Sequence, residues 1–142
     1  MGIVFLSGTE DIHSSQLQGF FVGWPDPPTP ETHLGLLQNS AEVVLALGQD
    51  TNKVVGFVSA ITDRVLTAYI PLLEVLPAYQ KRGIGQELMC RMRMQLDGFY
   101  MIDLSCDAPL QPFYKAVGME PAIGMLKRNY ARQSGDVNGR EG

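Results

Sequence analysis

Short apolar runs separated by turn residues occur along most of the chain, and they predict a protein rich in β-strands. The expected strands cover residues 3–6, 43–47, 54–62, 65–76, 101–106 and 123–126. The polar segment 49–53 predicts the turn of a hairpin between the second and third strands. The predicted sheet therefore contains at least one antiparallel pair.

Apolar residues at helical spacing predict the helices that lie between these strands. The expected helices cover residues 12–21, 30–40, 83–96 and 110–117. The third shows the clearest pattern, because one apolar residue recurs every four positions at Ile84, Leu88, Met92 and Leu96. The order of elements, β-αα-βββ-α-β-α-β, predicts an α+β fold with a mixed sheet.

The chain length suits a single domain. It has 142 residues, of which 45% are hydrophobic and 18% charged, which is the composition of a globular protein. We assign residues 1–130 to this domain. Residues 131–142 carry no core-forming pattern, and they predict a disordered tail.

Charge and residue usage exclude several classes of function. A net charge of −4 argues against a nucleic-acid partner. No apolar run approaches the roughly 20 residues of a membrane span, so we expect a cytoplasmic protein without a membrane partner. Cys90 and Cys106 make neither a disulfide framework nor a zinc site, and no metal is expected. His13 and His33 are expected to be solvated or to cap the N-terminal helices.

One short motif combines glycines with positive charge at a predicted strand–helix junction. Residues 80–85 read Gln-Lys-Arg-Gly-Ile-Gly. Glycines permit a tight turn, and the start of a helix offers unpaired N–H groups at the positive end of its dipole. Lys81 and Arg82 add charge beside them. The motif indicates an anion site, most naturally for a pyrophosphate. A plain strand–helix connection with two turn glycines would have the same sequence pattern.

Two motifs in the correct order resemble the GNAT acetyltransferase family. Residues 73–85, Leu-Glu-Val-Leu-Pro-Ala-Tyr-Gln-Lys-Arg-Gly-Ile-Gly, resemble its strand with L-x-V, a proline and Q/R-x-x-G-x-G/A at a helix start. Residues 112–119, Pro-Phe-Tyr-Lys-Ala-Val-Gly-Met, resemble its F-Y-x-x-x-G-F, with Met119 in place of the usual Phe. The resemblance covers most of residues 1–130. It implies a mostly antiparallel sheet, flanked by helices and splayed open at the fourth strand.

The same resemblance implies a site for acetyl-CoA as co-substrate. The backbone of Leu73 and Val75 would bind the pantetheine arm. The pyrophosphate would be held by residues 81–86, which are Lys81, Arg82, Gly83, Ile84, Gly85 and Gln86. Tyr114 would protonate the departing thiolate while the amine attacks the acetyl carbonyl directly. A nearby O–H makes physical sense, because it eases expulsion of a thiolate whose pKa is about 8.5.

The general base is not defined by the sequence. Relatives of the arylalkylamine type carry histidines on the fourth strand where this chain has Tyr69 and Pro71. Asp107, after the fifth strand, is the predicted catalytic carboxylate and would order a water or bind the ammonium. Glu74 is equally well explained as an edge charge.

Aromatic residues mark the expected acceptor side. Phe20, Trp24 and Tyr69 are predicted to bind the substrate, and we expect either Phe20 or Phe21 to pack in the core. Parts of the chain look similar to arylalkylamine and serotonin acetyltransferases, which implies a small, aromatic amine.

The leading hypothesis is an acetyl-CoA-dependent N-acetyltransferase for a small primary amine. One alternative is acetylation of a protein or peptide amine. Another is a non-catalytic acyl-CoA-binding module, which the absence of a base on the fourth strand favours and the intact Gly83, Gly85 and Tyr114 oppose. The sequence leaves open whether the chain forms a homodimer.

Overall fold

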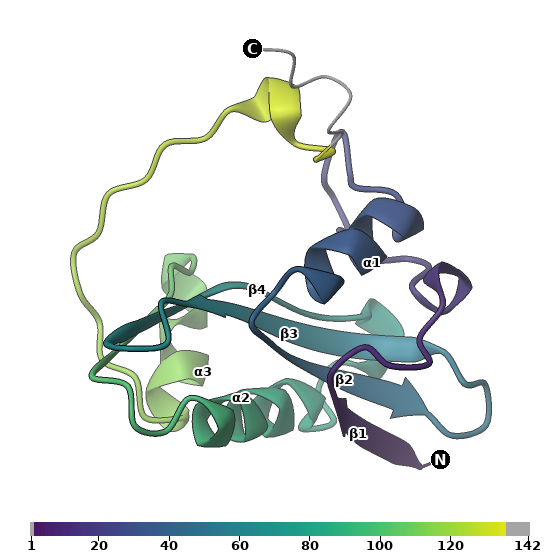
Figure 1. Ribbon diagram of the computed structural model, residues 1–142, viewed down its shortest axis with the longest axis horizontal. Coiled ribbons are helices and arrows are strands. Elements are labelled where there is room, and N and C mark those ends of the chain that lie inside the picture. The colour runs from purple at the N-terminus through teal and green to yellow at the C-terminus, as the bar shows by residue number, and fades with distance from the viewer. Residues whose placement is uncertain (1, 136–142) are drawn as a thin grey trace.

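One mixed sheet organises the chain in the computed structural model, which describes residues 2–135 (Figure 1). Its strands lie side by side in chain order and are β1 (Ile3–Ser7), β2 (Glu42–Gly48), β3 (Val54–Thr62), β4 (Thr67–Val75) and β5 (Met101–Asp103). The first four strands pair antiparallel, whereas β5 joins β4 in parallel. The predicted α+β fold with a mostly antiparallel sheet is confirmed.

Helices cover both faces of this sheet. The helix α1 (Pro30–Gln38) lies over one face and α2 (Ile84–Gln95) over the other, while α3 (Gln111–Ala116) follows β5 (Figure 1). Single 3₁₀ turns are η1 (Ser14–Gln16), η2 (Pro77–Tyr79), η3 (Ala108–Leu110) and η4 (Tyr130–Arg132). The start of α1 follows from its sequence, because the Thr29 hydroxyl accepts the Thr32 N–H at 3.1 Å and Pro30 occupies the first turn.

The core has two halves, one on each side of the sheet. Side chains alternate along a strand, so on β3 Val58 packs with α2 while its neighbour Phe57 packs with α1 and the loop before it. The predicted stripe of α2 is confirmed as fully or almost fully buried at Ile84, Leu88, Met92 and Leu96.

The predicted helix over residues 12–21 is wrong. Only Ser14–Gln16 forms a 3₁₀ turn, because Asp11, Gly19 and Phe21 adopt positive φ angles of 64°, 93° and 64° that a right-handed helix cannot contain. The apolar residues of this loop are nevertheless buried, and they are Ile12, Leu17, Phe20 and Phe21. Burial, not helix formation, explains their spacing.

The predicted strand over residues 123–126 is also wrong. Residues 119–129, which we call the arm, run in an extended path away from the rest of the molecule and pair with no strand within the described residues (Figure 1). Ile123 and Met125 are 102% and 101% exposed. Periodicity alone could not show that this apolar segment lacks a neighbour in its own chain.

Past the arm, the chain returns to the loop before α1. The Asp26 N–H donates to Gln133 Oε1 at 2.9 Å, just after η4. Residues 136–142 lie outside the described residues, so the predicted tail over 131–142 stays a prediction. Within residues 2–135 no helix is both long and apolar enough to cross a bilayer.

Candidate active site

The sheet opens between β4 and β5. Their pairing ends where Tyr69 lies opposite Asp103, yet β4 continues to Val75. The Leu76 N–H donates to Val55 O on β3 at 2.9 Å, so strand alternation turns the backbone groups of Val75 and Leu73 toward the opposite, open edge. The fourth strand is therefore splayed where the sequence predicted.

One acceptor on this open edge is already used. Gln80 Nε2 donates to Val75 O at 3.0 Å. The edge groups of Leu73 have no strand neighbour within the described residues on that side. An extended ligand could therefore hydrogen-bond there as an additional strand would.

The loop before α2 has the geometry of an anion cradle. Lys81 and Gly83 take positive φ angles of 64° and 81°, and Gly83 caps α2 with a left-handed backbone. The first intrahelical bond runs from the Glu87 N–H to Gly83 O at 3.0 Å, which leaves the preceding N–H groups of the first turn without helical partners. A Cβ built on Gly83 meets no atom within 4 Å, so the space over the helix start is open.

The two glycines of the motif have different roles. A Cβ on Gly85 would lie 3.4 Å from the Phe113 ring and 3.7 Å from Val75 Cγ2. Gly85 therefore lies against the Phe113 ring of α3, where a side chain would touch that ring, whereas Gly83 is needed for its backbone angle. The side chain of Ile84 is buried in the core, so only its backbone faces the loop.

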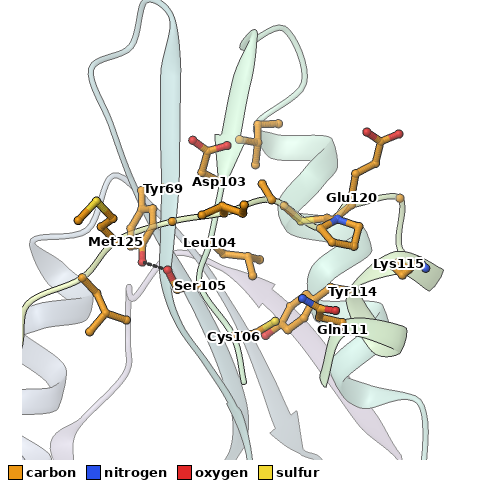
Figure 2. Close-up of a pocket in the computed structure, with 18 of the residues that line it drawn as sticks. Tyr69, Asp103, Leu104, Ser105, Cys106, Gln111, Tyr114, Lys115, Glu120 and Met125 are labelled. Carbon is orange, nitrogen blue, oxygen red and sulfur yellow. Dashed lines mark hydrogen bonds between the residues drawn. The ribbon is translucent and has the colours of Figure 1, made fainter. Parts of the chain in front are cut away.

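A large cleft of about 980 Å³ lies over β5 and α3, at the point where the pairing of β4 with β5 ends. Tyr69, Ser105, Cys106 and Tyr114 line it (Figure 2), together with residues of the arm. The Tyr69 hydroxyl donates to Ser105 Oγ at 3.3 Å, and Figure 2 shows the Cys106 sulfur beside the ring of Tyr114. The structure thus brings together the two tyrosines that the sequence placed in different roles.

Tyr114 is suited to donate a proton. Burial raises the pKa of its hydroxyl above the ordinary value, and Cys106 adds a smaller effect in the same direction. The phenol therefore stays protonated at neutral pH. Its ring is fixed by edge-to-face contact with Phe113 at 5.0 Å between ring centroids, and Phe113 in turn packs against Gly85. The anion loop and the proton donor are thus connected by direct packing.

The predicted carboxylate Asp107 lies at the margin of this arrangement. It is exposed, and its carbonyl accepts the Leu110 N–H at 2.9 Å where η3 begins. The carboxylates that line the large cleft are Asp103 and Glu120, and sequence reasoning missed both. Only the parallel β4–β5 register places Asp103 opposite Tyr69, and no local sequence signal encodes that register.

A second, smaller cavity of about 370 Å³ contains Trp24. Trp24 and Tyr69 therefore line different cavities. The Glu74 carboxylate accepts the N–H of Phe21 at 2.8 Å and that of Val22 at 3.2 Å, and the rings of Phe21 and Trp24 lie 4.8 Å apart. Glu74 holds the Trp24 loop on β4, a role that its position on the strand did not reveal.

Both Phe20 and Phe21 are buried, although we expected only one of them in the core. Phe20 packs edge-on against Phe57 at 5.2 Å and supports the wall of the smaller cavity from behind. The expectation of a solvated or capping His33 is wrong, because this side chain is 1% exposed among aromatic rings. Burial lowers the pKa of His33 to about 4.

No group of three metal-binding side chains occurs among residues 2–135. The features that remain are a sheet edge open to an extended ligand, an anion cradle and a protonated phenol beside a cleft. Together they suit an extended, anionic ligand that lies along β4 and reaches the start of α2.

Comparison with known proteins identifies the family. The model of the acetyltransferase (GNAT) family matches residues 9–119, and the chain belongs to that family. A crystal structure from Deinococcus radiodurans R1, named as an acetyltransferase, is 45% identical with a TM-score of 0.90 and covers 93% of this chain and 92% of that one.

Two curated relatives are more distant. The uncharacterized N-acetyltransferase ycf52 of Pyropia yezoensis is 28% identical over 81% of this chain and 69% of its own length. The histone acetyltransferase TAP1 of Glycine max is 28% identical over 83% of this chain and 56% of its own length. The protein is therefore an acetyl-CoA-dependent N-acetyltransferase of the GNAT kind.

Proposed function

We propose that the chain transfers the acetyl group of acetyl-CoA to a small primary amine with an apolar body. The observation that carries this proposal is the large cleft, which is lined by the half-buried phenol of Tyr114 and by the Tyr69–Ser105 pair, at the point where β4 parts from β5. Its volume of about 980 Å³ is at the upper end of the range for small-molecule sites, roughly 300–1,000 Å³.

The residues fit the co-substrate in two places. The open backbone of Leu73 and Val75 suits the amide-containing pantetheine arm. The helix start after Gly83, flanked by the exposed Lys81 and Arg82, suits a pyrophosphate. The remaining members of the proposed set, Ile84, Gly85 and Gln86, would contribute their backbone N–H groups. Acetyl-CoA supplies the thioester.

In the proposed reaction the amine nitrogen forms a bond to the acetyl carbon as the carbon–sulfur bond breaks. Tyr114 gives its proton to the leaving sulfur, and the surplus proton of the amine passes to water or to a carboxylate. Asp107 is the carboxylate predicted to order a water or bind the ammonium, whereas Asp103 and Glu120 are the carboxylates that line the cleft. The β4 positions 69 and 71 hold Tyr and Pro, which are poor bases at neutral pH.

The proposed acceptor side combines Tyr69 in the large cleft with Trp24 in the smaller cavity, which Phe20 supports from behind. These aromatic walls favour an apolar body on the amine. A protein amine is the second candidate, because one curated relative is named a histone acetyltransferase and the large cleft is open along one side.

Tyr114→Phe tests the chemistry. The variant keeps the ring contact with Phe113 but loses the proton donor, so kcat with the best amine should fall by about 10²–10⁴-fold. Affinity for acetyl-CoA should change by no more than about 1 kcal/mol, the net worth of one neutral hydrogen bond. Tyr130→Phe removes a hydroxyl from a tyrosine that is 72% exposed and is the matched control. An unchanged kcat in Tyr114→Phe would show that Tyr114 only fills the wall.

A panel of amines tests the acceptor. Purified chain is mixed with acetyl-CoA, and release of free thiol is followed with arylalkylamines, polyamines, aminoglycosides and a lysine peptide. The proposal expects the highest kcat/KM for a small amine with an apolar body. A lysine peptide as the best acceptor, with small apolar amines inert, would replace it by the second candidate.

A further inference from the structure

The smaller cavity, of about 370 Å³, is lined by three aromatic side chains, Phe21, Trp24 and Phe57. The ring centroids of Phe21 and Trp24 lie 4.8 Å apart, and those of Phe21 and Phe57 lie 6.2 Å apart. The three rings therefore form one continuous wall, in which Trp24 is 38% exposed and Phe57 is fully buried. Aromatic walls attract a cation, because the face of each ring carries partial negative charge.

One carboxylate lines this cavity without a counter-ion. Glu74 is the only charged residue among the described residues of the lining, and the others are aromatic, aliphatic or the neutral Gln80. Glu74 takes part in neither of the ion pairs that form among residues 2–135. The described part of the chain therefore provides no cation to compensate this charge, although the carboxylate belongs to a mostly apolar cavity.

The hydrogen bonds of Glu74 leave it able to bind a ligand. Its Oε1 accepts the Phe21 N–H at 2.8 Å, and its Oε2 accepts the Val22 N–H at 3.2 Å. A carboxylate has about four lone-pair positions, so each oxygen can accept one further hydrogen bond. Both donors are neutral backbone amides, which hold the carboxylate in place without cancelling its charge. The charge and the aromatic wall are thus fixed relative to each other.

We propose that the smaller cavity binds an organic ammonium group, held between the carboxylate of Glu74 and the rings of Phe21 and Trp24. Charge and aromatic wall select the same ligand. A neutral apolar group would contact the rings but would desolvate the carboxylate without compensation, and an anion would be repelled by it. An alkylammonium group both compensates the carboxylate and gains cation–π contact with the rings.

For the acceptor, this site implies a second cationic group. Tyr114 lines the large cleft, Glu74 and Trp24 line the smaller cavity, and no described residue lines both. An amine must be neutral to attack a thioester, so the nitrogen that reacts beside Tyr114 and the cation beside Glu74 are different groups. The acceptor is then a primary amine whose apolar body carries a second, ammonium group. This consequence rests on the proposed function, whereas the ammonium site itself does not.

Fluorescence of Trp24 tests the site directly, because Trp24 is the only tryptophan in the sequence. The full chain is titrated with choline at constant ionic strength and without acetyl-CoA, and the emission should change in a saturable way. The matched neutral ligand is 3,3-dimethylbutan-1-ol, in which carbon replaces the quaternary nitrogen, and it should bind about tenfold more weakly. Equal affinity for the two ligands, or no saturable change with choline, would overturn the proposal.

Two substitutions remove the negative charge in different ways. Glu74→Gln keeps an oxygen acceptor for the loop but loses the charge, so the affinity for choline should fall about tenfold while that for the neutral alcohol stays constant. Val22→Lys keeps both backbone hydrogen bonds and places an ammonium group of the chain itself beside Glu74, with the same expected result. Val22→Met is its matched control, since Val22 is 57% exposed, and it should bind choline like the wild type. Equal choline affinity in Val22→Lys and Val22→Met would overturn the proposal.

Competition kinetics tests the consequence for the acceptor. Tetramethylammonium has no N–H to acetylate, and it should inhibit competitively with the best amine but not with acetyl-CoA. Inhibition that is competitive with acetyl-CoA alone, or no inhibition at concentrations that saturate the Trp24 signal, would overturn the assignment of this cavity to the acceptor. The fluorescence titration requires no activity. A chain that binds choline but acetylates no amine would therefore contradict only the proposed function, and an active chain that does not distinguish choline from the alcohol would contradict only the ammonium site.

Discussion

His33 should make the folded state sensitive to mild acid. The imidazole is 1% exposed among Phe20, Phe21 and Phe57, with its ring centre 4.4 Å from that of Phe57. Neither ring nitrogen has a hydrogen-bond partner within the described residues. Since a charged imidazole would lose its hydration there without compensation, burial lowers the pKa of His33 from 6.5 to about 4.

The sign and size of the effect follow from these two pKa values. Well above pH 6.5 His33 is neutral in both states and has no influence on the pH dependence of stability. As the pH falls from 6.5 toward 4, the unfolded chain binds a proton that the folded chain does not, so the free energy of unfolding decreases. The loss reaches about 2 kcal/mol at pH 5 and about 3 kcal/mol once both states are protonated, at 1.36 kcal/mol per pH unit.

Urea unfolding at a series of pH values, with and without the histidine, measures this loss. His33→Leu keeps an apolar side chain of similar volume and removes the titration, so its advantage over the wild type should grow by about 2 kcal/mol between neutral pH and pH 5. His13→Gln is the control, because His13 is exposed, and it should follow the wild type. Parallel curves for His33→Leu and wild type would refute the reasoning, since other titrating groups are common to both.

Two further predictions concern the ends of the proposed site. Gly83→Leu should abolish the thermal stabilisation that acetyl-CoA gives, because the new side chain would fill the space over the start of α2. Gly98→Leu is the control, because Gly98 has a similar φ of 103° and equally open surroundings at the other end of α2. This control variant should still be stabilised by acetyl-CoA. Equal stabilisation in both variants would exclude the cradle. Glu74→Ala should raise the KM of the amine about tenfold, because the Phe21 and Val22 N–H groups lose a charged acceptor, and it should leave the KM of acetyl-CoA nearly constant. Trp24→Ala should also raise the KM of the amine. Glu42→Ala is the control, because it removes only an ion pair with the exposed Arg64, and it should change neither KM. A rise in the KM of acetyl-CoA alone would contradict the assignment of the Trp24 loop to the acceptor.

Local features of the chain were predictable because they depend on neighbours in sequence. The stripe of Ile84, Leu88, Met92 and Leu96 fixed the buried face of α2, and the glycine at position 83 fixed the left-handed cap at its start. The two motifs also identified the family, since each joins a backbone geometry to the side chains that its chemistry needs.

Contacts between distant residues needed the tertiary structure. Glu74 holds a loop more than 50 positions earlier in the chain, and Asp103 reaches the cleft only through the parallel register with β4. The packing of Phe113 against Gly85 similarly joins two different helices. None of these contacts can be predicted from the local sequence pattern, because many strand registers and packing arrangements are compatible with the same alternation of apolar and polar residues.

The two wrong elements have the same origin. Residues 12–21 have helical spacing and residues 123–126 have the apolar character of a strand, so the sequence by itself determined that each segment has apolar groups to cover. Positive φ angles at Gly19 and Phe21 fold the first segment into a buried loop, whereas the second extends away from every strand of its own chain. An apolar pattern specifies that surface must be removed from water, and only the tertiary structure decides which surface covers it and in which backbone conformation.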